Sequence, residues 1–252
     1  METNAIIETQ DLTKMYNGQA AVDHLTFTLQ EGEVFGFLGP NGAGKTTTLL
    51  MLMGLTEPTS GTARVLGFDP AREPIKVKQM IGYLQENVGF YGDLNAWQAL
   101  RFVAELNSLS PDVADERITA ALKTVALIDE AEKKIDAYSR GMRQRLGIAE
   151  VLIKDPKVVF LDEPTLGLDP DATNRMIELI QQLCREKKMT VLLSSHLLHL
   201  VQRICHRVGI MMKGRMVAQG TMDQLAQEKL GVGKKDYTLE EIYMKYFQEV
   251  CK

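Results

Sequence analysis

The sequence predicts an α/β protein in which helices cover both faces of a mostly parallel β-sheet and a helical segment is inserted into this core. From Asp155 onward, short apolar runs typical of buried strands alternate with segments of helical periodicity. Alternating β and α units of this kind favour a parallel sheet. Between Leu94 and Val125, apolar residues instead recur mainly at helical spacing, which predicts the inserted helical segment.

Length and composition are those of a globular protein with a large core. The 252 residues are 45% hydrophobic and 25% charged, and the net charge of −4 argues against nucleic acid as the main partner. Cys184, Cys205 and Cys251 show no metal-binding or disulfide spacing, so we expect reduced thiols in a cytoplasmic protein. We expect no secretory signal, because the first residues are partly acidic and lack a long apolar core, and no apolar run approaches the roughly 18 residues of a membrane-spanning helix.

The first part of the chain predicts strands and one helix. Residues 22–29 alternate polar and apolar side chains, which is the pattern of a half-buried strand. An apolar run at Val34–Leu38 predicts a buried strand, and Thr46–Met53 predicts a helix. Two further short strands are expected at Thr62–Leu66 and Ile81–Gln85.

The rest of the chain predicts helices first and then alternating elements. Apolar residues recur at helical spacing over 94–106 and again over 113–125, and Trp97 is expected to face the core of this segment. After residue 155 the expected strands and helices follow in the order Val158–Leu161, Met176–Cys184, Val191–Ser194, Leu197–Cys205 and Val208–Met212.

A phosphate-binding loop lies between the Val34–Leu38 strand and the helix after it. The pattern G-x-x-x-x-G-K-[ST] is met by Gly39, Pro40, Asn41, Gly42, Ala43, Gly44, Lys45 and Thr46, and Thr47 follows on the helix. The glycines let backbone N–H groups point at phosphate oxygens, and the helix N-terminus adds its dipole. Lys45 supplies charge to the β- and γ-phosphates, and the Thr46 hydroxyl can bind Mg²⁺. In this strand–loop–helix context the motif predicts binding of a nucleoside triphosphate.

Two carboxylates follow the apolar strand Val158–Leu161. They emerge at its carboxyl end, where ligands bind in open α/β sheets. Asp162 is placed to hold Mg²⁺ directly or through water, and Glu163 to polarise an attacking water as general base. Adjacent acidic residues are also common at helix starts and solvated turns, so it is their combination with the phosphate-binding loop that favours the functional interpretation.

Together with further motifs in a fixed order, these residues resemble the ATP-binding subunit of an ATP-binding cassette (ABC) transporter. Gln85 matches the Q-loop glutamine, and Tyr138–Arg145 stands where the signature motif belongs. Gly167–Pro170 matches the D-loop, and His196 matches the switch histidine. Tyr16 lies where the family places an adenine-stacking aromatic. The resemblance covers nearly the whole chain.

The resemblance implies a P-loop NTPase core with an N-terminal antiparallel β subdomain and an inserted α-helical subdomain. The ATP-binding domain is expected over residues 1–236, with the helical subdomain at about 86–153 inside it. A short C-terminal helical extension is expected over 237–252, similar to the helix that closes export-type subunits.

The resemblance also implies roles for residues at the nucleotide. Lys45, Glu163 and His196 would act in hydrolysis, with His196 sensing the γ-phosphate. Gln85 would contact Mg²⁺ and the attacking water and connect them to the helical region, and Tyr16 would stack on adenine. Each of three residues also has a structural alternative. His196 could be a structural histidine, Gln85 a solvated amide, and Tyr16 a tyrosine packed on a strand.

Other implied roles lie across a dimer of two such subunits. Ser139 and Gly141 would reach the γ-phosphate of ATP held by the opposite subunit, and Asp169 would couple the two sites. The alternatives are simple helix caps, because Ser and Asp are favoured at such positions. The signature departs from the common LSGGQ form at Tyr138, Arg140 and Met142, but the serine and the second glycine remain.

The implied function is a Mg²⁺-dependent ATPase that forms a head-to-tail dimer with a second ATP-binding subunit. It would drive a separate integral membrane permease from the inner face of the cell membrane, and the signature sequence resembles that of exporters. Phe90 and Tyr91, in the loop after Gln85, are expected to be exposed for that docking. The alternative is a soluble ABC ATPase acting on a ribosome or DNA-repair complex, although those relatives usually carry two cassettes or coiled-coil insertions.

Overall fold

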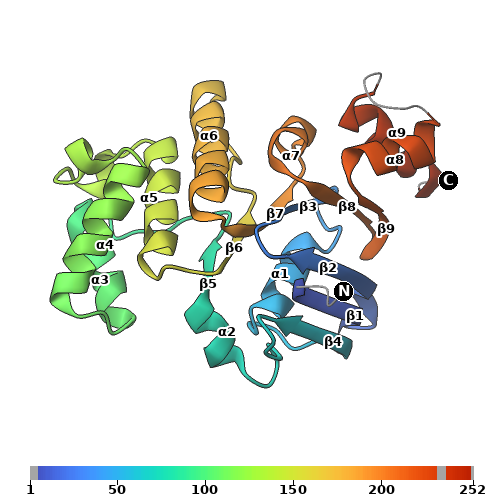
Figure 1. The fold of residues 1–252 in the computed structure, drawn as a ribbon, viewed down its shortest axis with the longest axis horizontal. Helices are drawn as coiled ribbons and strands as arrows, with labels where there is room; N and C mark the ends of the chain where they lie inside the picture. The colour runs from blue at the N-terminus through green and yellow to red at the C-terminus, as the bar shows by residue number, and fades with distance from the viewer. Residues whose placement is uncertain (1–4, 232–236, 251–252) are drawn as a thin grey trace.

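The computed structural model describes residues 5–231 and 237–250, and its main sheet has six strands. Their order is β5-β6-β7-β3-β8-β9 (Figure 1), and only β9 runs antiparallel to its neighbour. This confirms the mostly parallel sheet that the sequence predicts. The strand bounds are β3 Val34–Leu38, β5 Ile81–Leu84, β6 Val158–Asp162, β7 Thr190–Ser195, β8 Arg207–Met212 and β9 Arg215–Gly220.

A second sheet of three antiparallel strands confirms the expected N-terminal β region. Its order is β2-β1-β4, formed by β2 (Gln19–Gln30), β1 (Ala5–Tyr16) and β4 (Ser60–Val65). Asn17 and Gly18 join β1 to β2 with φ angles of 49° and 80°, as a tight two-residue hairpin turn requires. The hairpin strands are twelve residues each, longer than the alternation over 22–29 predicts.

The helices lie around the main sheet. Their bounds are α1 Lys45–Leu52, α2 Pro74–Met80, α3 Ala96–Leu106, α4 Pro111–Thr124, α5 Arg140–Ile153, α6 Pro170–Lys187, α7 Leu198–Ile204, α8 Met222–Leu230 and α9 Leu239–Val250. In Figure 1, α3, α4 and α5 gather on one side of the molecule. Of these helices, α3 and α4 lie in the stretch of sequence for which helices are predicted. The helices α2 and α8 and the strand β9 are not predicted from the sequence.

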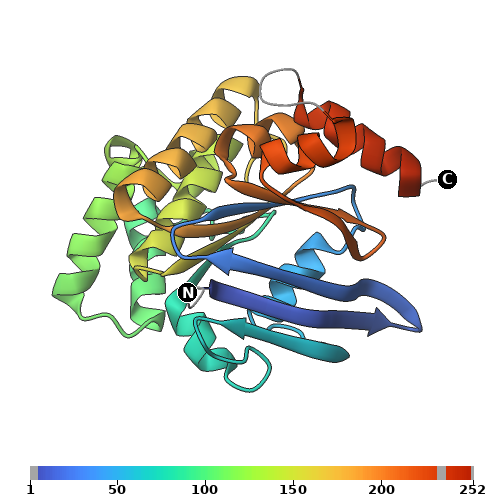
Figure 2. The ribbon, with the colours of Figure 1, turned by 45° about the vertical axis from the view of Figure 1, so that its right-hand side comes forward.

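Two hydrophobic clusters hold these layers together. One lies between the antiparallel sheet and the main sheet, where the rings of Phe27, Phe35 and Phe37 meet at centroid distances of 5.0–5.5 Å. Figure 2 shows α1 on this side of the main sheet and the longer helices on the other. Hydrophobic residues thus cover both faces of the parallel strands, and β3 and β6 are buried along their whole length.

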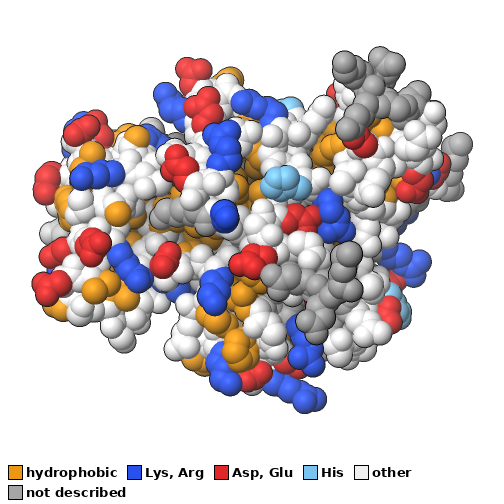
Figure 3. All heavy atoms as spheres, in the orientation of Figure 1, with side chains coloured by type: hydrophobic (Ala, Val, Ile, Leu, Met, Phe, Trp, Pro, Cys, Tyr) orange, Lys and Arg blue, Asp and Glu red, His pale blue; other side chains and the backbone are white. Residues whose placement is uncertain are grey.

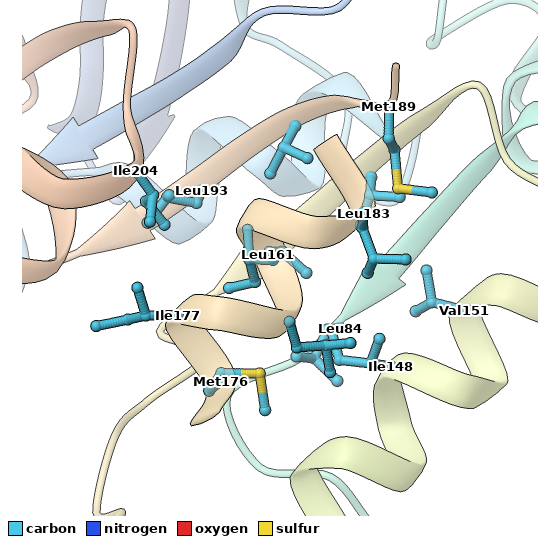
Figure 4. Packing of buried hydrophobic residues seen from close by; sticks show 14 of the residues in the cluster. Leu84, Ile148, Val151, Leu161, Met176, Ile177, Leu183, Met189, Leu193 and Ile204 are labelled. Atoms are coloured by element: carbon cyan, nitrogen blue, oxygen red, sulfur yellow. The ribbon is translucent and has the colours of Figure 1, made fainter. Parts of the chain in front are cut away.

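The second cluster joins the helical segment to the main sheet. Figure 4 shows Ile177 and Leu183 of α6 with Leu161 of β6 and Ile148 of α5, all members of this cluster. Trp97 on α3 is half-buried and packs against the same cluster, as expected. The inserted helices therefore share a continuous core with the strands that carry the candidate site.

The C-terminal helix and two cysteines belong to this side of the molecule. Leu239 and Ile242 of α9 are fully buried in the second cluster. Cys184 and Cys205 are free thiols, as expected, and burial raises the pKa of Cys184 to about 11. Such thiols stay protonated and unreactive at neutral pH. Cys251 lies outside the described residues.

Truncating the core of the helical segment is expected to destabilise the protein. Ile118 on α4 is fully buried, so Ile118→Ala should lower the free energy of unfolding by about 2–5 kcal/mol. Glu116→Ala, at an exposed position on the same helix, should change it by less than about 0.5 kcal/mol. Urea unfolding followed by circular dichroism measures both values, and equal values for the two variants would contradict the packing described.

Candidate active site

Three strand ends meet at one edge of the main sheet and form the candidate site. In the parallel register Leu38 of β3 pairs with Ser195 of β7, and Ser194 pairs with Asp162 of β6. Residues that follow these three strands therefore emerge side by side. This is the edge at which open α/β sheets bind ligands.

The backbone after β3 turns sharply into α1. Gly44 is the N-cap of α1 with a φ of 101°, and a Cβ there would lie 2.4 Å from the Ala21 carbonyl oxygen. Only glycine fits such a position. No side chain caps the helix, so the first N–H groups of α1 are left for an anion.

Lys45 is a buried cation at the start of α1. Its side chain is 6% exposed, and Nζ donates to the carbonyl oxygens of Gly39 at 2.8 Å and Pro40 at 3.3 Å. The same Nζ lies 3.4 Å from Oε1 of Glu163. The loop thus holds its cation toward the carboxylate that follows β6.

Asp162 ends β6 and is surrounded by hydroxyl donors. Thr46 Oγ1 donates to its Oδ2 at 2.9 Å and its Oδ1 at 3.1 Å, and Ser194 Oγ also donates to Oδ1. The Tyr83 hydroxyl lies 3.5 Å from Oδ2. Burial, and then the negative charge of Asp162, raise the pKa of Tyr83 to about 12, so this hydroxyl stays protonated as a donor.

Glu163 follows directly and is held by the end of β7. Its φ is 48°, a left-handed conformation uncommon outside glycine, and its N–H donates to the Ser194 carbonyl at 3.1 Å. His196 Nδ1 lies 2.9 Å from Oε2 of the carboxylate. In the described part of the chain Oε1 has no hydrogen-bond partner, although it is buried.

A pocket of about 390 Å³ opens beside these groups, within the usual size range of ligand sites. It is lined by Tyr16, Ala21, Asn41, Gly42, Ala43, Gly44, Lys45, Thr46, Thr47, Glu86 and Glu163. Two of these residues are not predicted from the sequence: Ala21, which β2 brings across the loop, and Glu86. Gln85 is exposed and does not line the pocket, whereas its neighbour Glu86 does.

The signature and D-loop residues lie outside this pocket. Ser139 is the N-cap of α5, where its Oγ accepts from the Met142 N–H at 3.2 Å. Asp169 is the N-cap of α6, where Oδ1 accepts from the Ala172 N–H at 2.8 Å. A Cβ on Gly141 would lie 3.0 Å from that of Ala172, so the two helix starts pack closely. Within a single chain, Ser139 and Asp169 are therefore helix caps, which is the structural alternative given for each of them.

The oxygen donors at the end of β6 fit Mg²⁺. The Thr46 hydroxyl and the Asp162 carboxylate are hard ligands of the type that this cation prefers. Among the described residues, no group of three or more His, Cys, Asp or Glu side chains converges on a metal position. Mg²⁺ commonly binds through one or two protein oxygens together with substrate phosphates, and the donor set agrees with that mode.

The loop after Gln85 places one aromatic residue at the surface. Tyr91 is 69% exposed, as expected, and its ring meets that of Phe102 on α3 edge-on at 6.4 Å. The expected exposure of Phe90 was wrong, because its side chain is half-buried against the second cluster. Figure 3 shows acidic and basic side chains interspersed over one whole face of the molecule.

No helix in the described ranges, 5–231 and 237–250, is long and apolar enough to cross a membrane.

Residues 22–166 match the family described as ABC transporter. The uncharacterized ABC transporter ATP-binding protein YhcH of Bacillus subtilis (strain 168) is 41% identical over 212 residues, covering 84% of this chain and 68% of YhcH. The bacitracin transport ATP-binding protein BcrA of Bacillus licheniformis is 40% identical over 222 residues, covering 88% of this chain and 72% of BcrA.

A solved structure of the ATP-binding subunit of an ABC transporter has a similar fold. It matches with a TM-score of 0.84 and 30% sequence identity, covering 96% of this chain and 99% of that one. The chain therefore belongs to the ABC transporter family, as one of its ATP-binding proteins.

Proposed function

We propose that this protein hydrolyses Mg²⁺-ATP as one subunit of a head-to-tail dimer that drives a separate integral membrane permease, from the cytoplasmic face of the membrane. The observation that carries the proposal is the Glu163 carboxylate, held between Lys45 and His196 at the edge of the nucleotide-sized pocket. A purely regulatory nucleotide switch has no need for a carboxylate in that position.

The residues of the pocket divide the chemical work. The loop N–H groups and Lys45 would bind the β- and γ-phosphates, and Tyr16, 46% exposed at the pocket's edge, would stack on adenine. Thr46 and Asp162 would hold Mg²⁺, with Gln85 reaching it from the adjoining loop. When bound, the metal would neutralise charge on the phosphates.

Glu163 would take the proton of the attacking water. Its Oε1 is buried 3.4 Å from Lys45 Nζ and has no hydrogen bond among the described residues, and Oε2 lies 2.9 Å from His196 Nδ1, so the carboxylate is oriented before ATP arrives. His196 would sense the γ-phosphate through the same contact. Preorganised charge of this kind is the main contribution of a protein to phosphoryl transfer.

The dimer would complete the site in trans. Ser139 and Arg140 are exposed at the start of α5 and lie outside their own subunit's pocket. A second subunit, identical or homologous, would place Ser139 and Gly141 at the γ-phosphate and bring Asp169 to the shared interface. The exposed N-terminus of α5 suits a phosphate.

The proposed membrane partner and direction of transport follow from one relative and from the signature sequence. BcrA carries the description of a bacitracin transport protein, and the signature sequence resembles that of export-type subunits, so we propose an exporter. The exposed Tyr91 and Phe102 pair would dock on the permease, since exposed aromatic residues are enriched at interface hot spots.

Loss of the proposed general base should stop turnover while ATP still binds. Glu163→Gln keeps the shape of the side chain but cannot accept the proton, so phosphate release should fall by about 10²–10⁴-fold. Glu86→Gln is the matched control, because Glu86 lines the same pocket without a hydrogen bond to Lys45 or His196 among the described residues. Near-native phosphate release by Glu163→Gln would refute this role.

A shared site should give crosslinks between subunits. Asn41→Cys and Arg140→Cys place exposed thiols beside the phosphate-binding loop and the signature serine. On a background without the native cysteines, ATP should promote disulfides between two chains, detected on non-reducing gels. Asn41→Cys paired with Glu116→Cys, at an exposed site on α4, is the control and should not crosslink. Crosslinks found only within one chain would contradict the head-to-tail dimer.

Removing the exposed aromatic pair should weaken docking and spare nucleotide binding. Tyr91→Ala and Phe102→Ala together should abolish co-purification with the proposed permease, because a hot-spot truncation costs about 2 kcal/mol or more. Met244→Ala, at a 43% exposed position on α9, is the control. Co-purification of the double variant at native yield would place the docking surface elsewhere.

A further inference from the structure

One buried hydroxyl joins both acidic residues of the candidate site. Ser194, near the end of β7, is fully buried, and its Oγ donates to Oδ1 of Asp162. The same Oγ accepts the N–H of Glu163 at 3.2 Å. A single side chain, outside every motif described above, thus forms hydrogen bonds with the last residue of β6 and with the residue that follows it.

The contact to Asp162 fixes the direction of its carboxylate. Asp162 is 2% exposed, so its oxygens depend on protein donors. Thr46 reaches both oxygens from α1, whereas Ser194 holds Oδ1 from the sheet. With a donor on each side, the Asp162 carboxylate is held in one orientation beside the Thr46 hydroxyl. This is where Mg²⁺ is proposed to bind.

The contact to Glu163 supports a backbone conformation that glutamate adopts rarely. The φ of Glu163 is 48°, and its N–H is shared between the carbonyl and the hydroxyl of Ser194. An uncommon conformation persists where the surrounding structure holds it, and such residues cluster at functional sites. His196, two residues after Ser194, holds the carboxylate of the same glutamate.

We propose that Ser194 is a positioning residue for hydrolysis, which orients Asp162 toward Mg²⁺ and Glu163 toward the attacking water. The inference rests on the proposed ATPase function and deepens it. Ser194 acts only through the Asp162 carboxylate and the Glu163 backbone, because it is fully buried and does not line the pocket. Loss of the Ser194 hydroxyl should therefore reduce the gain in nucleotide affinity that Mg²⁺ gives and the rate of ATP hydrolysis. Nucleotide binding without metal should stay unchanged.

The next residue supplies a matched control. Ser195 is also fully buried on β7, but its Oγ accepts the N–H of Leu197 at 2.9 Å and, within the described part of the chain, forms no hydrogen bond with Asp162 or Glu163. Ser195→Ala removes a hydroxyl of equal burial from the same strand. A general effect of losing a buried serine would appear in both variants.

The experiment compares native protein, Ser194→Ala and Ser195→Ala in three measurements. Calorimetry gives the Kd for the nonhydrolysable analogue AMP-PNP with Mg²⁺ and with EDTA, phosphate release gives kcat, and thermal unfolding checks folding. For Ser194→Ala we expect the Mg²⁺-dependent gain in affinity or kcat to fall by about 10–100-fold, as for other partners of metal ligands, with the EDTA Kd unchanged. Ser195→Ala should keep the native ratio of the two Kd values.

Each outcome decides the matter. An unchanged Mg²⁺ effect and kcat in folded Ser194→Ala, or equal losses in Ser195→Ala, would overturn the role of Ser194. Should Ser194→Ala fail to fold, Ser194→Cys replaces it, because a thiol fills similar space but is a weak donor, and the same loss is expected. Native protein that neither binds AMP-PNP nor hydrolyses ATP would instead refute the proposed function itself.

Discussion

The hydrogen bond between the Thr46 hydroxyl and the buried Asp162 carboxylate joins the two halves of the site, and the remaining geometry depends on it. The two residues are 116 positions apart in sequence, yet Oγ1 lies 2.9 Å from Oδ2. This requires β3 and β6 to end at one edge, with β7 between them in parallel register. Parallel strands need long crossover connections, and the segment containing α3, α4 and α5 is the connection between β5 and β6. The helical segment is thus part of what places Asp162.

Burial of charge explains why so many contacts converge here. Lys45, Asp162 and Glu163 are 6%, 2% and 7% exposed, and buried charges are costly unless they are paired and hydrogen-bonded. Lys45 is satisfied by two loop carbonyls, and Asp162 by hydroxyls. Glu163 Oε1 is the exception, since it is buried and has only the more distant Lys45 near it. An incompletely satisfied acceptor beside a pocket is a natural position for a proton to be taken.

Sequence motifs predicted the site better than they predicted the elements around it. The phosphate-binding loop and the β6 carboxylates could be identified because their spacing is local and their strand context is strongly apolar. Elements such as α2 and β9 lack a strong periodic pattern, and they form by packing on neighbouring strands, α2 on β5 and β9 on β8. Phe90 was misjudged because flanking glycines suggested an exposed loop, whereas packing against the core decides its position. Ser194 could not be found, since only the strand register brings it to Asp162.

The two interpretations of the signature serine are compatible once its hydrogen-bonding capacity is counted. A serine hydroxyl has one donor and two acceptor lone pairs, and the cap of α5 uses only one lone pair of Ser139, which accepts from Met142. The O–H proton remains available to a phosphate oxygen. Asp169 likewise uses only Oδ1 for the cap of α6. In both residues the cap fixes the position of the side chain and leaves a polar atom exposed. The structural role therefore prepares the proposed role across the dimer rather than competing with it.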